Sequence, residues 1–275
     1  MRDRTPQGAP NAWPAALRFF VLVFALAVPF WLIGTLTELQ LLPGLPVSAL
    51  SFICPGAAAL ILAYASRGSA GAVELLKRAF DVKRISAKVW YAPALLLVPA
   101  VTVLGYVLMR LTGLPLPAPQ FPLLAAVSLG VVFFVAALGE ELGWSGYAVD
   151  PLQDRSTALE AAILVGLVWA AVHYVPLVQA HRTVSWIAWW SLGTVALRVL
   201  IVWLYNNTGR SVFAATLCHA SANLSWQLFP VHGSSWDPRI NGLLVAGVAA
   251  IVILVWGPKT LTGRNVSRAN RREAP

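Results

Sequence analysis

The chain has 275 residues, of which 58% are hydrophobic and 11% are charged, and its formal net charge is +9. Soluble domains carry about 25% charged residues, so this composition excludes a soluble globular domain and predicts a polytopic membrane protein. The basic residues lie in short segments between apolar runs and at the chain ends, as topology-setting charges do, so we expect no nucleic-acid partner.

The chain contains apolar runs long enough to cross a membrane, since a spanning helix needs about 20 mainly apolar residues. The expected fold is therefore all-α, a polytopic membrane helix bundle with about eight transmembrane helices. We expect one transmembrane domain over residues 18–257, after a cytoplasmic N-terminal segment 1–17 and before a cytoplasmic basic tail 258–275. In chain order the expected spans are 18–36, 46–65, 89–109, 122–147, 158–177, 185–205, 211–229 and 241–256.

A basic amphipathic segment, residues 67–88, lies between the second and third expected spans. We expect it to form a helix on the membrane surface, or else a solvated connector. With this number of spans it falls on the same side as the N-terminal arginines and the basic tail. Because Lys and Arg collect on the cytoplasmic side, we predict a multi-pass protein of the cell membrane with both termini in the cytoplasm.

Two adjacent carboxylates, Glu140 and Glu141, stand near the end of a long uncharged run that begins after Arg110. An ionised carboxylate inside a membrane costs about 2.5–3.5 kcal/mol on insertion scales, and two neighbours also repel each other. Ionisable residues at such positions are functional by default and have partners elsewhere in the bundle. The sequence therefore predicts a functional site at this pair.

Candidate partners lie on two later spans. His173 stands near the end of the fifth span, and His219 and Asn223 lie on the seventh at a spacing of i, i+4, which stacks them on one helix face. A buried carboxylate beside an imidazole is suited to deprotonate a water molecule. A histidine and an asparagine on one face can donate two hydrogen bonds to an oxyanion. This set therefore indicates hydrolysis of an amide.

The sequence contains three short motifs: Glu140, Glu141, Trp144 and Gly146, then Trp169, His173 and Pro176, then His219 and Asn223. Together they resemble the motifs of the CPBP intramembrane proteases, or Abi family, which contains the CAAX prenyl proteases and bacteriocin-processing and immunity proteins. The resemblance implies an eight-helix membrane fold with a catalytic chamber open to the cytosol and lipid, and here a protease core at about residues 121–229.

The family's roles carry over by position. The resemblance implies that Glu140 activates the water with help from His173, that His219 and Asn223 form the oxyanion hole, and that Glu141 is a supporting acid.

Two positions depart from the family's pattern. Ser145 stands where the family usually has arginine, and Trp169 where it usually has phenylalanine. Losing the arginine removes a cation that holds a carboxylate ionised. Arg198, in the middle of the sixth span, is a candidate substitute that would pair with Glu140 or Glu141. The alternative is that Arg198 caps backbone carbonyls or lines a water pocket.

Other readings of the same residues stay open. Residues 143–146 fit the Gly-x-Ser-Gly pattern of rhomboid-type serine proteases, with Ser145 as nucleophile and His219 as base. A divalent metal such as zinc, held by Glu140, His173 and His219, is a further alternative, because two His and a Glu suffice for a catalytic zinc site. A non-catalytic binding or immunity protein of the same fold, or a transporter, is the alternative outside enzymes.

The sequence thus predicts an intramembrane endopeptidase that cleaves a membrane-anchored protein or peptide, CAAX-type or other, near the cytosolic membrane surface. Trp144 and Trp169 are expected to shape the substrate pocket. Counted at 1.5 Å per residue, Glu140 and His219 lie about 10–12 Å into the membrane and His173 about 22 Å, so His173 joins them only if its helix tilts or starts below the surface. Natural substrate and oligomeric state are left open.

Overall fold

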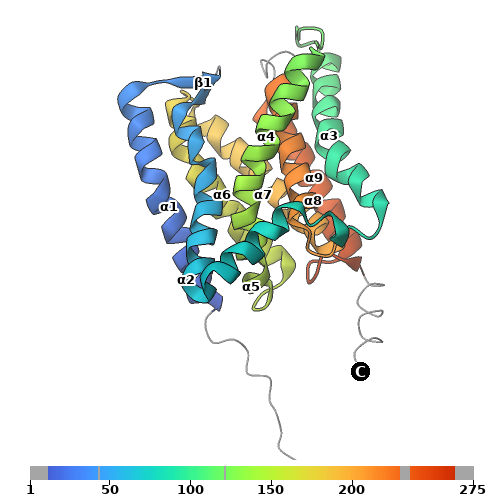
Figure 1. The fold of residues 1–275 in the computed structure, drawn as a ribbon. Helices are drawn as coiled ribbons and strands as arrows, with labels where there is room; N and C mark the ends of the chain where they lie inside the picture. Colours follow the sequence, from blue (N-terminus) through green and yellow to red (C-terminus); the bar gives the residue numbers. More distant parts are fainter. Residues whose placement is uncertain (1–11, 43, 121, 230–235, 264–275) are drawn as a thin grey trace, which may run out of the picture.

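The computed structural model describes residues 12–42, 44–120, 122–229 and 236–263, which form a helical bundle with one small hairpin (Figure 1). The all-α prediction is confirmed. The long helices are α1 (Ala12–Thr37), α2 (Cys54–Lys77), α3 (Tyr91–Leu111), α4 (Leu123–Gly143), α6 (Ala158–Gln179), α7 (Val184–Asn207), α8 (Val212–Leu228) and α9 (Pro238–Trp256). The hairpin pairs β1 (Gln40–Leu42) with β2 (Leu45–Pro46), and a 3-10 segment, Val47–Ile53, leads from it into α2.

Each expected span corresponds to one of these long helices. Within the described residues, seven helices are long and apolar enough to cross a membrane. The remaining one, α8, has 17 residues and packs against α3, α4 and α7 in the interior. Outward-facing side chains such as Leu124, Val131 and Leu254 are 62–83% exposed, as a lipid-facing surface requires.

The bundle has two distinct ends (Figure 1). α1 begins and α9 finishes at the lower end, which we call the terminal face, and the β1–β2 hairpin lies at the upper end, which we call the hairpin face. α4 runs from the hairpin face to the terminal face, whereas α6 and α8 run the other way.

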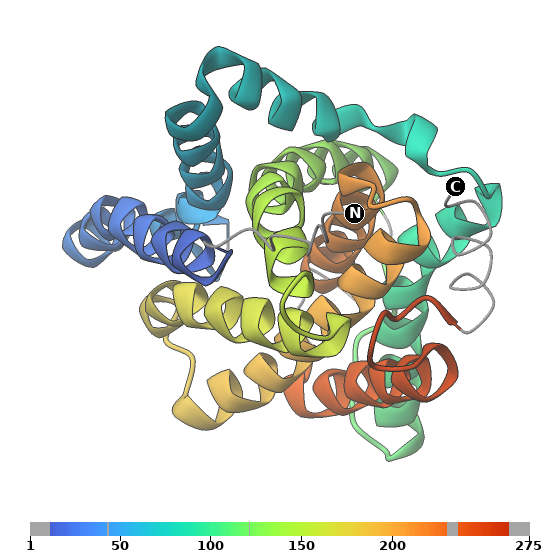
Figure 2. The same cartoon turned by 90° about the horizontal axis from the view of Figure 1, so that it is seen from below.

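The connector between α2 and α3 crosses the terminal face and passes along the outside of α4 and α8 (Figure 2). Helix α2 breaks at Arg67 and Gly68, where Gly68 has a φ of +61°, and then continues to Lys77. Three 3-10 turns follow, at Arg78–Phe80, Val82–Arg84 and Lys88–Trp90. The expected surface helix over residues 67–88 is therefore right only up to Lys77.

Helices α2 and α4 approach each other closely through glycines. A Cβ built on Gly143 would lie 2.4 Å from the backbone oxygen of Pro55, and one built on Gly56 would lie 2.5 Å from that of Gly139. Neither position has room for a larger residue. These contacts fix the terminal-face end of α4, which carries Glu140 and Glu141.

Beyond Gly143 the chain does not leave the helix but widens into a π-helix, Trp144–Val149, followed by the short α5 (Asp150–Gln153). Nothing in the sequence predicts this widening. Single-turn π segments inside α-helices are frequent at functional sites.

Candidate active site

One large cavity of about 530 Å³ lies inside the bundle. Helices α3, α4, α6, α7, α8 and α9 contribute to its wall, together with the hairpin. Glu140, His173, His219 and Asn223 all line it, so the structure brings four of the five predicted catalytic residues to one space. The expected difference in depth does not separate the two histidines, because the rings of His173 and His219 both lie against that of Trp169, with centroids 5.9 Å and 4.9 Å away.

Glu140 is only 4% exposed and is held by two indoles. Its Oε2 accepts hydrogen bonds from Trp144 Nε1 at 3.2 Å and from Trp169 Nε1 at 2.6 Å. Its Oε1 lies 3.8 Å from His219 Nε2, too far for a direct hydrogen bond. One oxygen is therefore fixed by neutral donors, and the other faces His219 across a gap.

Glu141 does not line the cavity. It is fully buried and ion-paired with Arg198, whose Nη1 lies 2.8 Å from Oε2. Ser145 Oγ donates to the same oxygen, and Oε1 bonds His219 Nδ1 at 2.9 Å. Of the two partners considered for Arg198, the structure has Glu141. Position 145 carries a serine, and the cation beside Glu141 comes from α7.

Ser145 is fully buried and bonds Glu141, not His219. Since His219 turns one nitrogen to Glu141 and the other toward Glu140, the structure does not support a Ser145–His219 dyad.

The hydrogen bonds also fix the tautomers of both histidines. His173 Nδ1 lies 2.8 Å from the carbonyl oxygen of Trp169, which can only accept, so Nδ1 carries the proton. His219 Nδ1 faces the Glu141 carboxylate and donates in the same way. In both neutral rings Nε2 is therefore the basic nitrogen.

Trp169 contacts more of these groups than a phenylalanine could. Its indole nitrogen bonds Glu140, its ring lies 4.3 Å from the guanidinium carbon of Arg198, and its centroid is 4.9 Å from that of His219 and 5.9 Å from that of His173. The exchange of phenylalanine for tryptophan therefore adds a hydrogen-bond donor to Glu140.

The described residues do not bring a set of metal ligands together. Among the described residues, no three His, Cys, Asp or Glu side chains are grouped as metal ligands would be. The ligand set Glu140, His173 and His219 is therefore not assembled, and no step below uses a metal.

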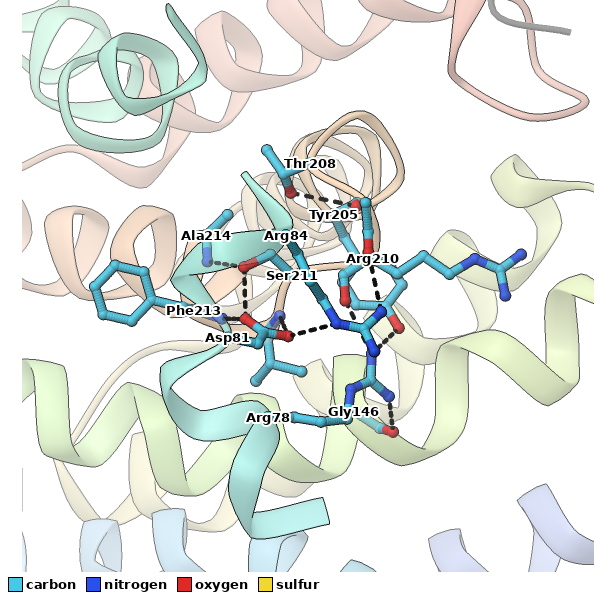
Figure 3. A network of polar contacts seen from close by, with 12 residues as sticks. Arg78, Asp81, Arg84, Gly146, Tyr205, Thr208, Arg210, Ser211, Phe213 and Ala214 are labelled. Atoms are coloured by element: carbon cyan, nitrogen blue, oxygen red, sulfur yellow. Dashed lines mark hydrogen bonds and ion pairs between the residues drawn. The ribbon is translucent and has the colours of Figure 1, made fainter. Parts of the chain in front are cut away.

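Arg78 lies in the connector between α2 and α3, where the sequence indicated only solvated charges. Its side chain binds the connector to the π-helix (Figure 3). Its Nη1 donates to the carbonyl oxygen of Gly146 at 2.6 Å, and its Nη2 donates to the hydroxyl of Tyr205 at 2.6 Å and to the carbonyl of Arg210 at 2.9 Å. Tyr205 in turn donates to Asp150 Oδ2 at 3.0 Å. Arg78 thereby fixes the segment that directly follows the two glutamates.

Asp81, three residues further along, caps α8 (Figure 3). Its Oδ1 accepts from Ser211 Oγ at 2.7 Å and from the backbone nitrogen of Phe213 at 3.1 Å, and its Oδ2 accepts from that of Val212 at 3.2 Å. A carboxylate at a helix N-terminus accepts hydrogen bonds from free N–H groups and interacts favourably with the positive end of the helix dipole. The connector thus holds both the π-helix after Glu140 and the start of the helix that carries His219.

Comparison with known proteins identifies the same region. Residues 119–225 match the family described as Type II CAAX prenyl endopeptidase Rce1-like. The chain is also 26% identical over 261 residues to a protein named CAAX prenyl protease 2 from Methanococcus maripaludis, a match that covers 86% of this chain and 92% of that protein. The resemblance to CAAX prenyl proteases is confirmed, over residues 119–225 by a peptidase family and over most of the chain by this relative.

Proposed function

We propose that this protein is an intramembrane endopeptidase in which Glu140 activates a water molecule to cleave a peptide bond of a membrane-associated substrate. One observation carries the proposal: among the described residues that line the cavity, Glu140 is the only carboxylate. We place this catalytic unit at about residues 121–229, inside a single membrane domain of residues 18–257.

Glu140 is positioned to act as the general base. The two indoles hold its Oε2, so Oε1 is the oxygen that takes the proton of a water molecule. The water oxygen attacks the carbonyl carbon of the peptide, and Glu140 then gives the proton to the leaving amine, which returns the carboxylate to its ionised form. His173, with its basic Nε2, assists by accepting a hydrogen bond from the same water.

His219 and Asn223 are the donors for the oxyanion in this scheme. The amide of Asn223 donates directly. Because Nδ1 of His219 already donates to Glu141, Nε2 carries a proton only when the ring is an imidazolium. Glu141 and Arg198 therefore act through His219, as positioning residues.

The first substrates to test are prenylated CAAX peptides, since the relative's name points to them, together with membrane-anchored peptides that lack the prenyl group. We expect purified protein in detergent to cleave one of these, and Glu140→Ala to abolish cleavage. Glu74→Ala is the matched control, because Glu74 is 65% exposed and pairs only with Arg67 among the described residues. Cleavage that persists in Glu140→Ala would contradict the proposed mechanism.

A further inference from the structure

The connector residues 78–84, which we call the strap, hold two elements that are far apart in the sequence (Figure 3). Arg78 donates to the carbonyl oxygen of Gly146 in the π-helix, and Asp81 accepts from the first backbone nitrogens of α8. The π-helix extends α4, which carries the two glutamates, and α8 carries the proposed oxyanion donors. No strap residue is among the described residues that line the cavity, so the strap connects the two sides of the site from outside it.

The sequence explains why the π-helix accepts a hydrogen bond from the strap. In a π-helix each N–H group bonds the carbonyl oxygen five residues earlier, so the donor for Gly146 would come from residue 151. This residue is Pro151, which has no N–H group. Arg78 Nη1 lies 2.6 Å from the carbonyl oxygen of Gly146 and supplies the donor that the π pattern lacks there.

The same π-helix holds both glutamates through its first two side chains. Trp144 Nε1 donates to Glu140 Oε2 at 3.2 Å. Ser145 Oγ donates to Glu141 Oε2. Gly146 is the next residue, and a Cβ built on it would lie 3.5 Å from the carbonyl oxygen of Glu141. A shift of Gly146 would therefore move the donors of both carboxylates.

Arg78 also binds the junction between α7 and α8. Its Nη2 donates to the hydroxyl of Tyr205, near the end of α7, at 2.6 Å and to the carbonyl oxygen of Arg210 at 2.9 Å. Arg210 directly precedes Ser211, the N-cap residue of α8. One guanidinium therefore links the π-helix to the start of α8, and its planar fork of donors has no equivalent in lysine.

Removal of Arg78 leaves no carboxylate stranded. Asp150 lies 3.8 Å from Arg78 Nη1, but Arg210 Nη1 is closer, at 3.4 Å, and the hydroxyl of Tyr205 donates to Asp150 at 3.0 Å. Asp150 thus keeps two partners when Arg78 is replaced. We therefore expect variants at Arg78 to fold, in contrast to removal of the buried counter-ion Arg198.

We propose that Arg78 is a positioning residue of this site, which fixes the π-helix against the start of α8 and so sets the separation of Glu140 and His219. Glu140 Oε1 and His219 Nε2 lie 3.8 Å apart. Their separation matters because a misplacement of about 1 Å, caused far from the chemistry, can cost about a hundredfold in rate. The effect on catalysis rests on the proposed endopeptidase function, whereas the link between the strap and α8 does not.

The kinetics of Arg78→Met test the role in catalysis. We expect kcat to fall roughly tenfold to a hundredfold, KM to stay unchanged because Arg78 does not line the cavity, and the pH–rate profile to change shape. A smaller folded fraction would instead lower the rate by one factor at every pH. Arg78→Lys keeps a donor for one acceptor and should restore part of kcat. A uniform fall across the pH range, or a change in KM alone, overturns the proposal.

Arg84→Met is the matched control. Arg84 belongs to the same strap and its side chain is 50% exposed. Within the described residues it contacts Asp81 and the carbonyl oxygen of Gly209, not the π-helix. We expect its kcat to stay within about twofold of the wild type. Equal losses in Arg84→Met and Arg78→Met would overturn the assignment of Arg78.

Thiol labelling tests the link between the strap and α8 without a substrate. Cys218 directly precedes His219 on α8, Cys54 lies at the end of α2 that is remote from the strap, and both are buried. Maleimide labelling of purified protein in detergent, followed by peptide mass spectrometry, gives the rate at each cysteine.

We expect Arg78→Met to speed the labelling of Cys218 roughly tenfold and to leave that of Cys54 unchanged, because local opening of α8 becomes easier. An unchanged rate at Cys218, or equal acceleration at both cysteines, overturns the proposal. If no peptide is cleaved by the wild type but Cys218 reacts faster in the variant, the endopeptidase function is contradicted while the link between the strap and α8 stands.

Discussion

The ion pair between Arg198 and Glu141 is the interaction on which stability depends most directly. Arg198 Nη1 and Glu141 Oε2 are 2.8 Å apart, and both side chains are fully buried. At an effective dielectric constant of about 20 the attraction at this distance is about 6 kcal/mol, although desolvation of the two charges offsets much of it. Removing one partner is a different matter, because it leaves the other charge buried and uncompensated.

We therefore expect Arg198→Met to lower the free energy of unfolding by about 3–5 kcal/mol. For a chain of this size each kcal/mol shifts the midpoint of thermal unfolding by about 2 °C, so a fall of about 6–10 °C is expected. The assay is the thermal unfolding of purified protein in detergent. Adding Glu141→Gln to Arg198→Met removes the stranded charge and should restore most of the loss.

Arg239→Met is the matched control. Arg239 also pairs with a carboxylate, Asp237, but its side chain is 65% exposed. Exposed pairs contribute about 0–1 kcal/mol, so this variant should unfold within a few degrees of the wild type. If Arg198→Met behaved like Arg239→Met, or if Glu141→Gln gave no rescue, Arg198 would not be the partner that compensates Glu141.

Three further substitutions and one neutralisation test the site itself. Trp169→Phe keeps an aromatic ring but removes the hydrogen-bond donor to Glu140. A hydrogen bond to a charged group contributes about 1.5–3 kcal/mol, so kcat/KM should fall roughly tenfold to a hundredfold while the protein stays folded. Unchanged kinetics would contradict this role of Trp169. Ser145→Ala removes one of the three partners of Glu141 among the described residues, also a hydrogen bond to a charged group, and should cost about 1.5–3 kcal/mol while cleavage continues; loss of cleavage in a folded variant would revive the serine mechanism. Gly143→Ala places a methyl group against the backbone of α2 and should destabilise by about 1–3 kcal/mol, which an unchanged unfolding midpoint would refute. Glu140→Gln removes a charge from the cavity, so cleavage should stop while the unfolding midpoint stays equal or rises; a large fall in that midpoint would assign Glu140 a structural role.

Hydropathy predicted the bundle well because the thickness of a membrane requires about 20 mainly apolar residues in every span. Each expected span became a long helix, and errors are confined to the ends: α1 starts at Ala12, not at residue 18, and α7 continues to Asn207. The π-helix Trp144–Val149 could not be predicted, since its residues are compatible with an ordinary helical turn and the widening follows from packing.

The positions of the site residues were predictable, but several of their contacts were not. The i, i+4 spacing placed His219 and Asn223 on one face, and both line the cavity. Trp144 and Trp169 were expected only to shape a pocket, because sequence does not give the rotamer that directs both indole nitrogens to Glu140. Asp81 was hidden because a charged residue in a basic connector is usually solvated.

The two adjacent glutamates show why one short motif can serve two tasks. The side chains of neighbouring residues on a helix point about 100° apart. In a pair of glutamates at the wall of a cavity, one carboxylate can therefore face the cavity while the other lies among the packed side chains. The interior one, Glu141, has its charge matched by Arg198 and its remaining oxygen used by His219. The one that faces the cavity, Glu140, accepts hydrogen bonds within the described part of the chain only from neutral indoles. Its negative charge thus stays available to a water molecule, an arrangement that packing alone does not require.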